Sequence, residues 1–297
     1  MPDLPTTQPP GSDPSRLALL IDTDNALGSP SGDVDDAFAV VALLRSGLPI
    51  AAISSVGGNT SEREADRNNR RLGALLGYAG PYLRGVEAGE MGASEVRVDR
   101  PEAYPPSARK GLRVAALGPL TNVAALLRGA GNGECPPLAE VIAVGGTLRT
   151  RGRYPPWWPR EFNLTHDLPA TRAVFDSGIP LTLVPLDVAR RLRIGFRELA
   201  HLRGDAGERL RRGARRWCLR SLLVRGSDRF PVFDLVAAYA WAEPRRVEVQ
   251  DRRARLHPNG WVEFGVGERT IRVVTDFRPE EAWEWFVRLV NRADSAA

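Results

Sequence analysis

The sequence predicts an α/β fold, an open and mainly parallel β-sheet with helices on both faces and a Rossmann-like core. Two observations support this. Short apolar runs alternate with helical segments from Arg16 to Val188, and several of those runs end in polar or glycine residues. Apolar runs without polar alternation are typical of parallel strands that are buried on both faces.

The predicted elements follow one another in a regular order. Strands are expected at residues 16–22, 50–59, 112–118, 140–146 and 180–188, with helices at 33–47, 61–77, 119–129 and 167–178. Acidic residues in the first turn and Gly47 after the last turn favour the helix at 33–47. Pro119 and Thr121 are residue types that favour a helix start.

Beyond Arg190 the pattern changes to longer, arginine-rich helical segments. A hairpin follows, with Asn259 and Gly260 as its expected turn, and a last helix is expected from Pro279. Because no linker interrupts this pattern, we expect one domain over residues 16–297. Residues 1–15 are rich in Pro, Ser and Thr and are expected to form a disordered tail.

The composition is that of an ordinary globular chain, with 43% hydrophobic and 26% charged residues among 297. No apolar run approaches the roughly 20 residues that span a bilayer, and no signal peptide is visible, so we expect a cytoplasmic protein without a membrane partner. Cys135 and Cys218 stand outside any metal or disulfide pattern.

The net charge is +5, and nearly all of the basic residues are arginine. Arginines are densest between Arg203 and Gly226, a segment that we interpret as a solvated helix face. No basic strand with interleaved aromatic residues accompanies it, so nucleic acid is not an expected partner.

Clustered carboxylates form the most informative feature of the chain. Five aspartates fall within fifteen residues, directly after the first apolar run: Asp22, Asp24, Asp33, Asp35 and Asp36. Ligands of open parallel sheets bind beyond the carboxyl ends of the strands, which is where this cluster begins. Oxygen ligands without Cys or His partners indicate a hard cation such as calcium. For Asp33 we favour a different role, as the N-cap of the following helix.

The sequence does not match two common ion- and phosphate-binding motifs. The aspartate spacing differs from that of an EF-hand, and the glycine-containing loop lacks the ending of a phosphate loop. A strand that ends in Asp-x-Asp also begins phosphatases of the haloacid dehalogenase type. That alternative explains only the first motif of the chain.

Seven stretches together suggest a family. In chain order they are DTD…DVDDAFA, VGGNTSEREADRNN, ALGPLTNVA, VIAVGG, EFNLTHDLPATRAVFDSG, LTLVPLDV and VFDLVAAYA. In these stretches the chain resembles the inosine–uridine-preferring nucleoside hydrolases. The resemblance implies calcium-dependent hydrolysis of the N-glycosidic bond of ribonucleosides, giving free base and ribose. It also implies a homodimer or homotetramer.

By position, Asp24 resembles the family's metal-binding aspartate that also activates the attacking water. Asp36 resembles the bidentate metal ligand, and Asp234 the distant one. The family's backbone carbonyl ligand falls at Leu117. These four residues are therefore the expected calcium ligands, with Asp24 as the expected catalytic base.

The resemblance also assigns the sugar contacts. Asp35 corresponds to the carboxylate that engages the ribose 2′-hydroxyl, while Asn59, Glu161 and Asn163 resemble the residues that hold the ribose. Asn68 matches a family position too, where we expect a structural hydrogen bond.

Three departures from the family pattern bear on substrate choice. An insertion, Asn25–Gly32, separates Asp24 from Asp35, and we expect it to bulge outward. Phe233 stands where many members carry a histidine that protonates the leaving base. The segment before Glu161 lacks the usual asparagine that contacts the ribose 5′-hydroxyl.

Phe233 cannot donate a proton, but it can stack on a base, which favours purine nucleosides. Trp157 and Trp158 are either a second stacking face or loop packing. A different function is a nucleoside- or ribose-binding protein with a calcium pocket and little turnover. Asp24 beside Asp36 favours the enzyme, because a binding protein needs no water-activating carboxylate.

Overall fold

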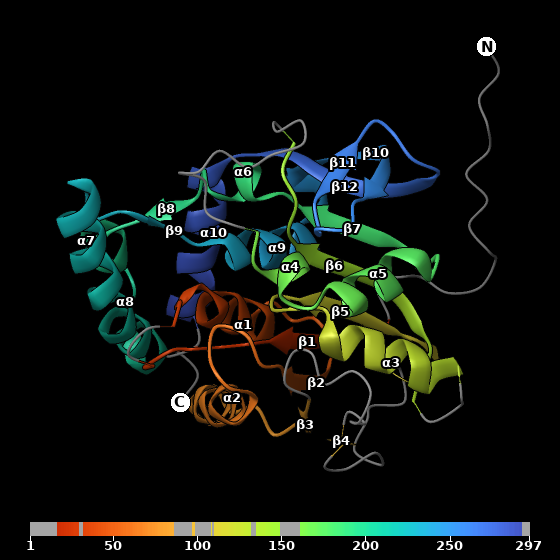
Figure 1. Ribbon diagram of the computed structural model, residues 1–297. Coiled ribbons are helices and arrows are strands. Elements are labelled where there is room, and N and C mark those ends of the chain that lie inside the picture. Colours follow the sequence, from red (N-terminus) through yellow and green to blue (C-terminus); the bar gives the residue numbers. More distant parts are fainter. Residues whose placement is uncertain are drawn as a thin grey trace.

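The computed structural model describes residues 17–29, 32–85, 97–98, 108, 110–131, 135–148 and 161–292. Over these residues its centre is one sheet of ten strands, in the order β11-β10-β12-β7-β6-β5-β1-β2-β3-β4 (Figure 1). The strands are β1 (Ala18–Thr23), β2 (Ile50–Ser55), β3 (Tyr82–Arg84), β4 (Arg97–Val98), β5 (Leu112–Ala116), β6 (Leu138–Val144), β7 (Leu181–Val184), β10 (Val247–Leu256), β11 (Val262–Phe264) and β12 (Arg269–Phe277). A separate antiparallel pair joins β8 (Arg193–Ile194) to β9 (Phe230–Pro231).

The central strands of the sheet, from β12 through β7, β6, β5, β1 and β2 to β3, are parallel to their neighbours. Antiparallel pairs occur only toward the two edges, where β10 joins β11 and β12, and β4 joins β3. The predicted fold class, a mainly parallel open sheet in an α/β protein, is confirmed.

Helices cover both faces of the sheet. They are α1 (Asp35–Arg45), α2 (Glu62–Leu75), α3 (Thr121–Gly131), α4 (Asn163–His166), α5 (Leu168–Asp176), α6 (Leu186–Ala189), α7 (Phe196–Leu199), α8 (Gly204–Arg225), α9 (Phe233–Ala242) and α10 (Pro279–Arg292). Leu19 and Ile21 of β1 belong to one buried cluster with residues of α1, α9 and α10, and α8 packs on the outer side of α1 and α10; Leu20 belongs to a second cluster with α3 and α5 on the opposite face. The apolar run that predicted β1 therefore serves two cores at once.

Two predicted element boundaries differ from the structure for a clear physical reason. The strand expected at 180–188 ends at Val184, because Pro185 has no N–H for the ladder and precedes the short helix α6. The N-cap of α1 is Val34, not Asp33. Asp33 Oδ1 instead accepts a hydrogen bond from the Val34 N–H (2.6 Å). The hairpin turn at Asn259 and Gly260 is confirmed between β10 and β11, and Gly260 has a φ of 83°.

The order of the strands sets the location of the site. β1 lies between β5 and β2, so the chain leaves it toward one side first and reaches the other side later. In open α/β sheets, such a switch point leaves a crevice at the carboxyl ends of the strands. Here those ends belong to β1 and β5, directly before Asp24 and Leu117.

Some predictions lie outside the described residues, namely the tail at 1–15 and the pair Trp157 and Trp158. The single domain over 16–297 also stays a prediction. Across the described ranges, no helix combines the length and apolar character needed to cross a bilayer.

Candidate active site

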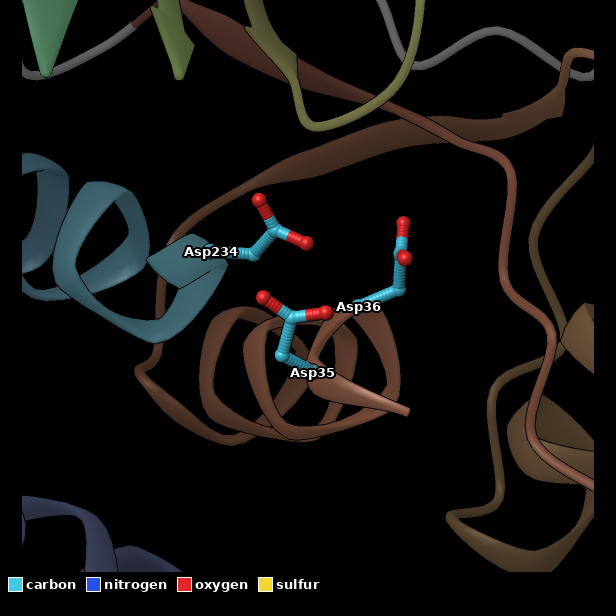
Figure 2. A group of neighbouring side chains, drawn as sticks. All are labelled: Asp35, Asp36 and Asp234. Carbon is cyan, nitrogen blue, oxygen red and sulfur yellow. The ribbon is translucent and has the colours of Figure 1, made fainter. Parts of the chain in front are cut away.

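Three carboxylates converge beside the carboxyl ends of the central strands. Asp35 and Asp36 open α1, and Asp234 lies in the first turn of α9. One carboxylate oxygen from each lies within 4.8 Å of the others, and all three residues are buried. Figure 2 shows the side chains around a shared space, with Asp234 entering from α9 and the other two from α1. We call these three residues the acid group.

Asp24 lies next to the acid group, at the end of β1. Its Oδ2 accepts a hydrogen bond from the Asn59 N–H (2.6 Å), and its Oδ1 lies 3.4 Å from Asn59 Nδ2. A Cβ at Gly58 would lie 2.1 Å from Asp24 Oδ2, so only glycine permits this approach. The Asp24 carboxyl also faces Asp36. Asp24 and Asn59 are therefore held together, as their predicted roles require.

The charges in this region are poorly compensated by the protein. Burial raises the pKa of Asp36 well above its usual range, and the nearby Asp24 and Asp35 carboxylates raise it further. Burial also raises the pKa of Asp234, with Asp35 and Asp36 adding to the effect. In addition, Asp36 Oδ2 is buried without a hydrogen-bond partner among the described residues. Buried carboxylates that face one another need a cation or protons, and their all-oxygen chemistry fits a hard divalent cation.

Asp35 differs from Asp36 in its partners. Its Oδ2 accepts a hydrogen bond from the Phe233 N–H (3.0 Å), which joins α1 to the start of α9. Burial raises the pKa of Asp35, and the nearby Asp33 carboxylate raises it further. Phe233 itself is half-buried and packs partly against the core, one residue before Asp234.

Leu117 and Asn163 meet at the end of β5. The Leu117 carbonyl oxygen accepts a hydrogen bond from Asn163 Nδ2 (2.8 Å), and its N–H donates to the Asp22 carbonyl (2.8 Å). A carbonyl oxygen has two lone pairs, so this hydrogen bond leaves one for a metal ion. The predicted carbonyl ligand and the predicted sugar-binding amide are thus neighbours.

Both carboxylate oxygens of Glu161 accept hydrogen bonds from backbone N–H groups. Its Oε2 accepts from the Gly146 N–H (2.7 Å) and its Oε1 from the Leu164 N–H (3.2 Å). Burial raises the pKa of Glu161 to about 7, although both hydrogen bonds favour the ionised form. The carboxylate thus ties the end of β6 to α4, and it lies outside the acid group.

Asp22 on β1, two residues before Asp24, forms hydrogen bonds that join the elements around the site. Its Oδ1 accepts hydrogen bonds from Asn122 Nδ2 (2.8 Å) and Ser54 Oγ. Burial raises the pKa of Asp22 to about 7, while these two donors lower it. Asn122 Nδ2 also reaches the Ser55 carbonyl (3.0 Å), so one amide connects β1, β2 and α3.

The insertion between Asp24 and Asp35 does not simply bulge outward. Ala26 and Leu27 are fully buried, and the Asn25 side chain bonds the Asn69 amide oxygen (3.0 Å). Asn68 Nδ2 donates to the Asn25 carbonyl (3.0 Å), which is the structural hydrogen bond expected of Asn68. The expectation of an outward bulge is therefore wrong for this first half, because its polar groups find partners on α2.

From the sequence, Asp35 was expected to contact the sugar and was not included among the expected metal ligands. Its adjacency to Asp36 was visible, but its distance from Asp234 depends on how α9 packs against α1. The roles of Asn25 and Asn69 were also missed. The pair of asparagines in DRNN was the only available signal.

Comparison with known proteins gives this arrangement a context. The profile of the inosine-uridine preferring nucleoside hydrolase family matches residues 19–284. The chain belongs to this family. The match includes the carboxyl ends of β1 and β5, the acid group and Phe233.

This member of the nucleoside hydrolase family shares only a minor part of its sequence with a curated relative. It is 29% identical over 203 residues to the non-specific ribonucleoside hydrolase RihC of Escherichia coli, a match that covers 59% of this chain and 63% of that protein. The chain thus matches less than two thirds of the length of this curated relative.

Two solved structures share the fold. A purine-preferring ribonucleoside hydrolase from Gardnerella vaginalis gives a TM-score of 0.74 at 20% identity, covering 94% of this chain and all of that one. The plant nucleoside hydrolase PpNRh1 gives a TM-score of 0.73 at 19% identity, covering 93% and 99%.

Proposed function

We propose that this protein hydrolyses the N-glycosidic bond of ribonucleosides and releases the free base and ribose. The observation that carries the proposal is the acid group beside Asp24, at the switch point of a nucleoside hydrolase fold. Buried carboxylates that repel one another destabilise the folded chain unless they bind an ion. An ion that takes part in the reaction would relieve the repulsion between these carboxylates when it binds.

We further propose calcium as the ion, held by Asp24, Asp36, Asp234 and the Leu117 carbonyl. Calcium accepts six to eight oxygens and commonly mixes carboxylates with carbonyls, whereas magnesium usually keeps more of its water. When bound, the ion supplies Lewis acidity and a fixed point for the ribose diol.

The remaining chemistry belongs to the chain. Asp24, oriented by the Asn59 N–H, takes a proton from the attacking water as its oxygen bonds to the anomeric carbon. The bond between that carbon and the base nitrogen breaks, and the base leaves with the bonding electrons and takes up a proton from solvent. Neighbouring carboxylates stabilise the positive charge that develops on the sugar.

Sugar positioning falls to Asp35, Asn59, Glu161 and Asn163. Asp35 and Asn163 are tied to the backbone of Phe233 and Leu117, so their side chains are held in place before a substrate arrives. Glu161 acts through the backbone of Gly146 and Leu164.

Phe233 is proposed as the contact for the base. It begins α9 next to Asp234, and an aromatic ring there stacks on a base without protonating it. Purines offer the larger stacking surface, so purine nucleosides are the proposed preference. A homodimer or homotetramer and a cytoplasmic location complete the proposal.

The competing function is a nucleoside- or ribose-binding protein with little turnover. Phe233 favours it, since no proton donor stands at this position. The contact between Asp24 and Asp36 favours hydrolysis, because binding alone does not require a base beside a metal ligand.

One assay separates the two functions. The full chain is incubated with purine and pyrimidine nucleosides, with calcium and after chelation, and the released base and ribose are measured. We expect release that chelation abolishes and calcium restores. An Asp24→Asn variant should bind nucleoside but lose roughly 10²- to 10⁴-fold in rate, the usual contribution of a general base. Binding by the wild-type protein without release would leave the binding protein as the better description.

A further inference from the structure

A cavity of about 340 Å³ lies between the insertion and helix α8. Gly28, Ser29, Arg209, Arg212, Arg216 and Trp217 form most of its wall, and no member of the acid group lines it. Val34 does line it, directly before Asp35. The cavity is therefore a neighbour of the acid group but a separate space.

Positive charge dominates this cavity. Arg209, Arg212 and Arg216 follow a spacing of three and four residues, which puts them on one face of α8. Arg212 forms an ion pair with Glu208, one turn earlier in the helix. In the described part of the chain, no carboxylate forms an ion pair with Arg209 or Arg216. Three guanidinium groups around one cavity repel one another, so an anion between them is stabilising.

The opposite wall of the cavity is fixed in place. Trp217 Nε1 donates to the Gly32 carbonyl (3.1 Å), and the Leu27 side chain packs where a Cβ on Gly213 would lie 2.3 Å from it. Gly28 has a φ of 102°, and a Cβ there would lie 3.3 Å from Arg209 Nη2. Glycines thus allow the loop and the arginines to approach closely.

An unsatisfied hydroxyl lies in the same wall. Ser29 Oγ is buried, and no described residue is its hydrogen-bond partner. A buried donor without a partner is destabilising, so an acceptor placed next to Ser29 Oγ is favoured. Guanidinium groups and a hydroxyl are the donors that bind phosphate oxygens in proteins.

Nucleic acid fits this surface less well than a small anion. Beyond the cavity, α8 exposes apolar side chains, with Leu223 exposed to 86% and Val224 to 74%. After Arg220 the basic face is therefore interrupted by these apolar side chains, which are a poor track for a phosphate backbone. Arg220 also lies over the Trp217 ring at 5.4 Å, which leaves less of that ring for stacking on a base.

We propose that this cavity binds the phosphoryl group of a small phosphorylated molecule. The proposal goes beyond nucleoside hydrolysis and does not depend on it. Two kinds of ligand could carry this phosphoryl group. It belongs to a ligand whose sugar reaches the acid group, such as a nucleoside 5′-monophosphate, or to a separate molecule.

Calorimetric titration of the full chain tests the proposal, with inorganic phosphate, a nucleoside 5′-monophosphate and the matching nucleoside as probes. Inorganic phosphate is titrated without calcium, so that no calcium phosphate forms, whereas the monophosphate and the nucleoside are each titrated with and without calcium. Arg209→Gln and Arg216→Gln should each weaken phosphate binding roughly tenfold, the loss expected for one charged hydrogen bond. Arg215→Gln is the matched control, because Arg215 lies on the same helix but lines a neighbouring groove.

Thermal unfolding of each variant shows that it is folded, which is expected for an exposed residue such as Arg216. The proposal is overturned if phosphate does not bind saturably, or if Arg215→Gln weakens binding as much as Arg216→Gln does. Stronger binding of the monophosphate than of phosphate and nucleoside supports a ligand shared with the acid group. Equal binding of phosphate and monophosphate supports a separate molecule.

A failed hydrolysis assay with intact phosphate binding would count against the proposed hydrolase alone. The two proposals can therefore fail independently.

Discussion

Asp22 and Asp36 are equally buried near the same strand end, yet different kinds of neighbour act on their pKa values. For Asp22, the strongest influences after burial are two hydrogen-bond donors, Ser54 and Asn122, which lower its pKa. For Asp36, they are two carboxylates, Asp24 and Asp35, which raise its pKa. Burial alone therefore does not distinguish a structural acid from a ligand.

The difference lies in what surrounds each carboxylate. Asp22 Oδ1 and both oxygens of Glu161 accept hydrogen bonds from N–H or O–H groups of the chain, while Asp22 Oδ2 has no partner among the described residues. Asp36 and Asp234, the proposed ion ligands, face other carboxylates, and the donor to Asp36 is Thr23 Oγ1. The comparison predicts opposite responses to substitution and to metal.

The largest effect is expected at Asp36. Asp36→Asn removes a proposed metal ligand and should lower nucleoside hydrolysis by about 10³-fold, equivalent to several kcal/mol of lost metal-ion catalysis. The same change removes repulsion, so the metal-free variant should unfold at a higher urea concentration than metal-free wild type. Hydrolysis rates and urea unfolding in chelator measure the two effects. A variant that is less stable without metal would contradict the proposed repulsion.

Glu161 should make stability depend on pH. Its pKa of about 7 exceeds the ordinary value of 4.5, so the folded state holds this proton more tightly than the unfolded state does. The contribution of this group is most favourable below pH 4.5 and is lost as pH rises to about 7, by about 3 kcal/mol in total.

Glu161→Gln should remove that part of the slope. Unfolding free energies of wild type and variant, measured from pH 4 to pH 8 in steps of about one unit, give the difference. Glu284→Gln, at an exposed position, is the control. Equal slopes in wild type and Glu161→Gln would show that Glu161 does not titrate in this range.

Calcium should stabilise the protein through the acid group. Binding to the folded state alone adds about 2.7 kcal/mol to the free energy of unfolding at a calcium concentration 100-fold above the dissociation constant. Asp234→Asn should lose most of this gain. Urea unfolding with and without calcium measures it, and an unchanged gain in Asp234→Asn would remove that residue from the ligand set.

Asn122→Ala should give the smallest of these effects. It leaves Asp22 with one donor fewer and should lower the free energy of unfolding by about 2 kcal/mol. The gain in stability on adding calcium should be unchanged, since Asn122 acts on the structural acid. A loss of that gain would mean that the two kinds of acid are not separate.

Local patterns in the sequence were sufficient to predict most of the fold. Buried runs such as Leu19–Ile21 identified the parallel strands, because each side chain packs into a core whichever face it meets. The end of β7 was missed because apolar residues continue past Pro185, where the strand has already given way to α6.

The site was predictable only in part. Asp24 and Asp36 could be singled out as candidates from their position after a strand and at the start of a helix, and their roles stay predictions. That Asp234 lies near Asp36 was expected only from the family resemblance, and its approach to Asp35 was not expected, because it depends on packing between residues about 200 positions apart. Leu27 was also missed, since a loop of Gly, Ser and Pro resembles an exposed one until its packing partner on α8 is known.

The central place of β1 has a consequence for hydrogen exchange. Its amides are bonded between β5 and β2 and covered on both faces, so they should exchange only when the whole sheet opens. The β8–β9 pair and the β10–β11 hairpin, at the margins, should exchange earlier. The strand that leads into Asp24 would then stay assembled while the periphery of the molecule opens and closes.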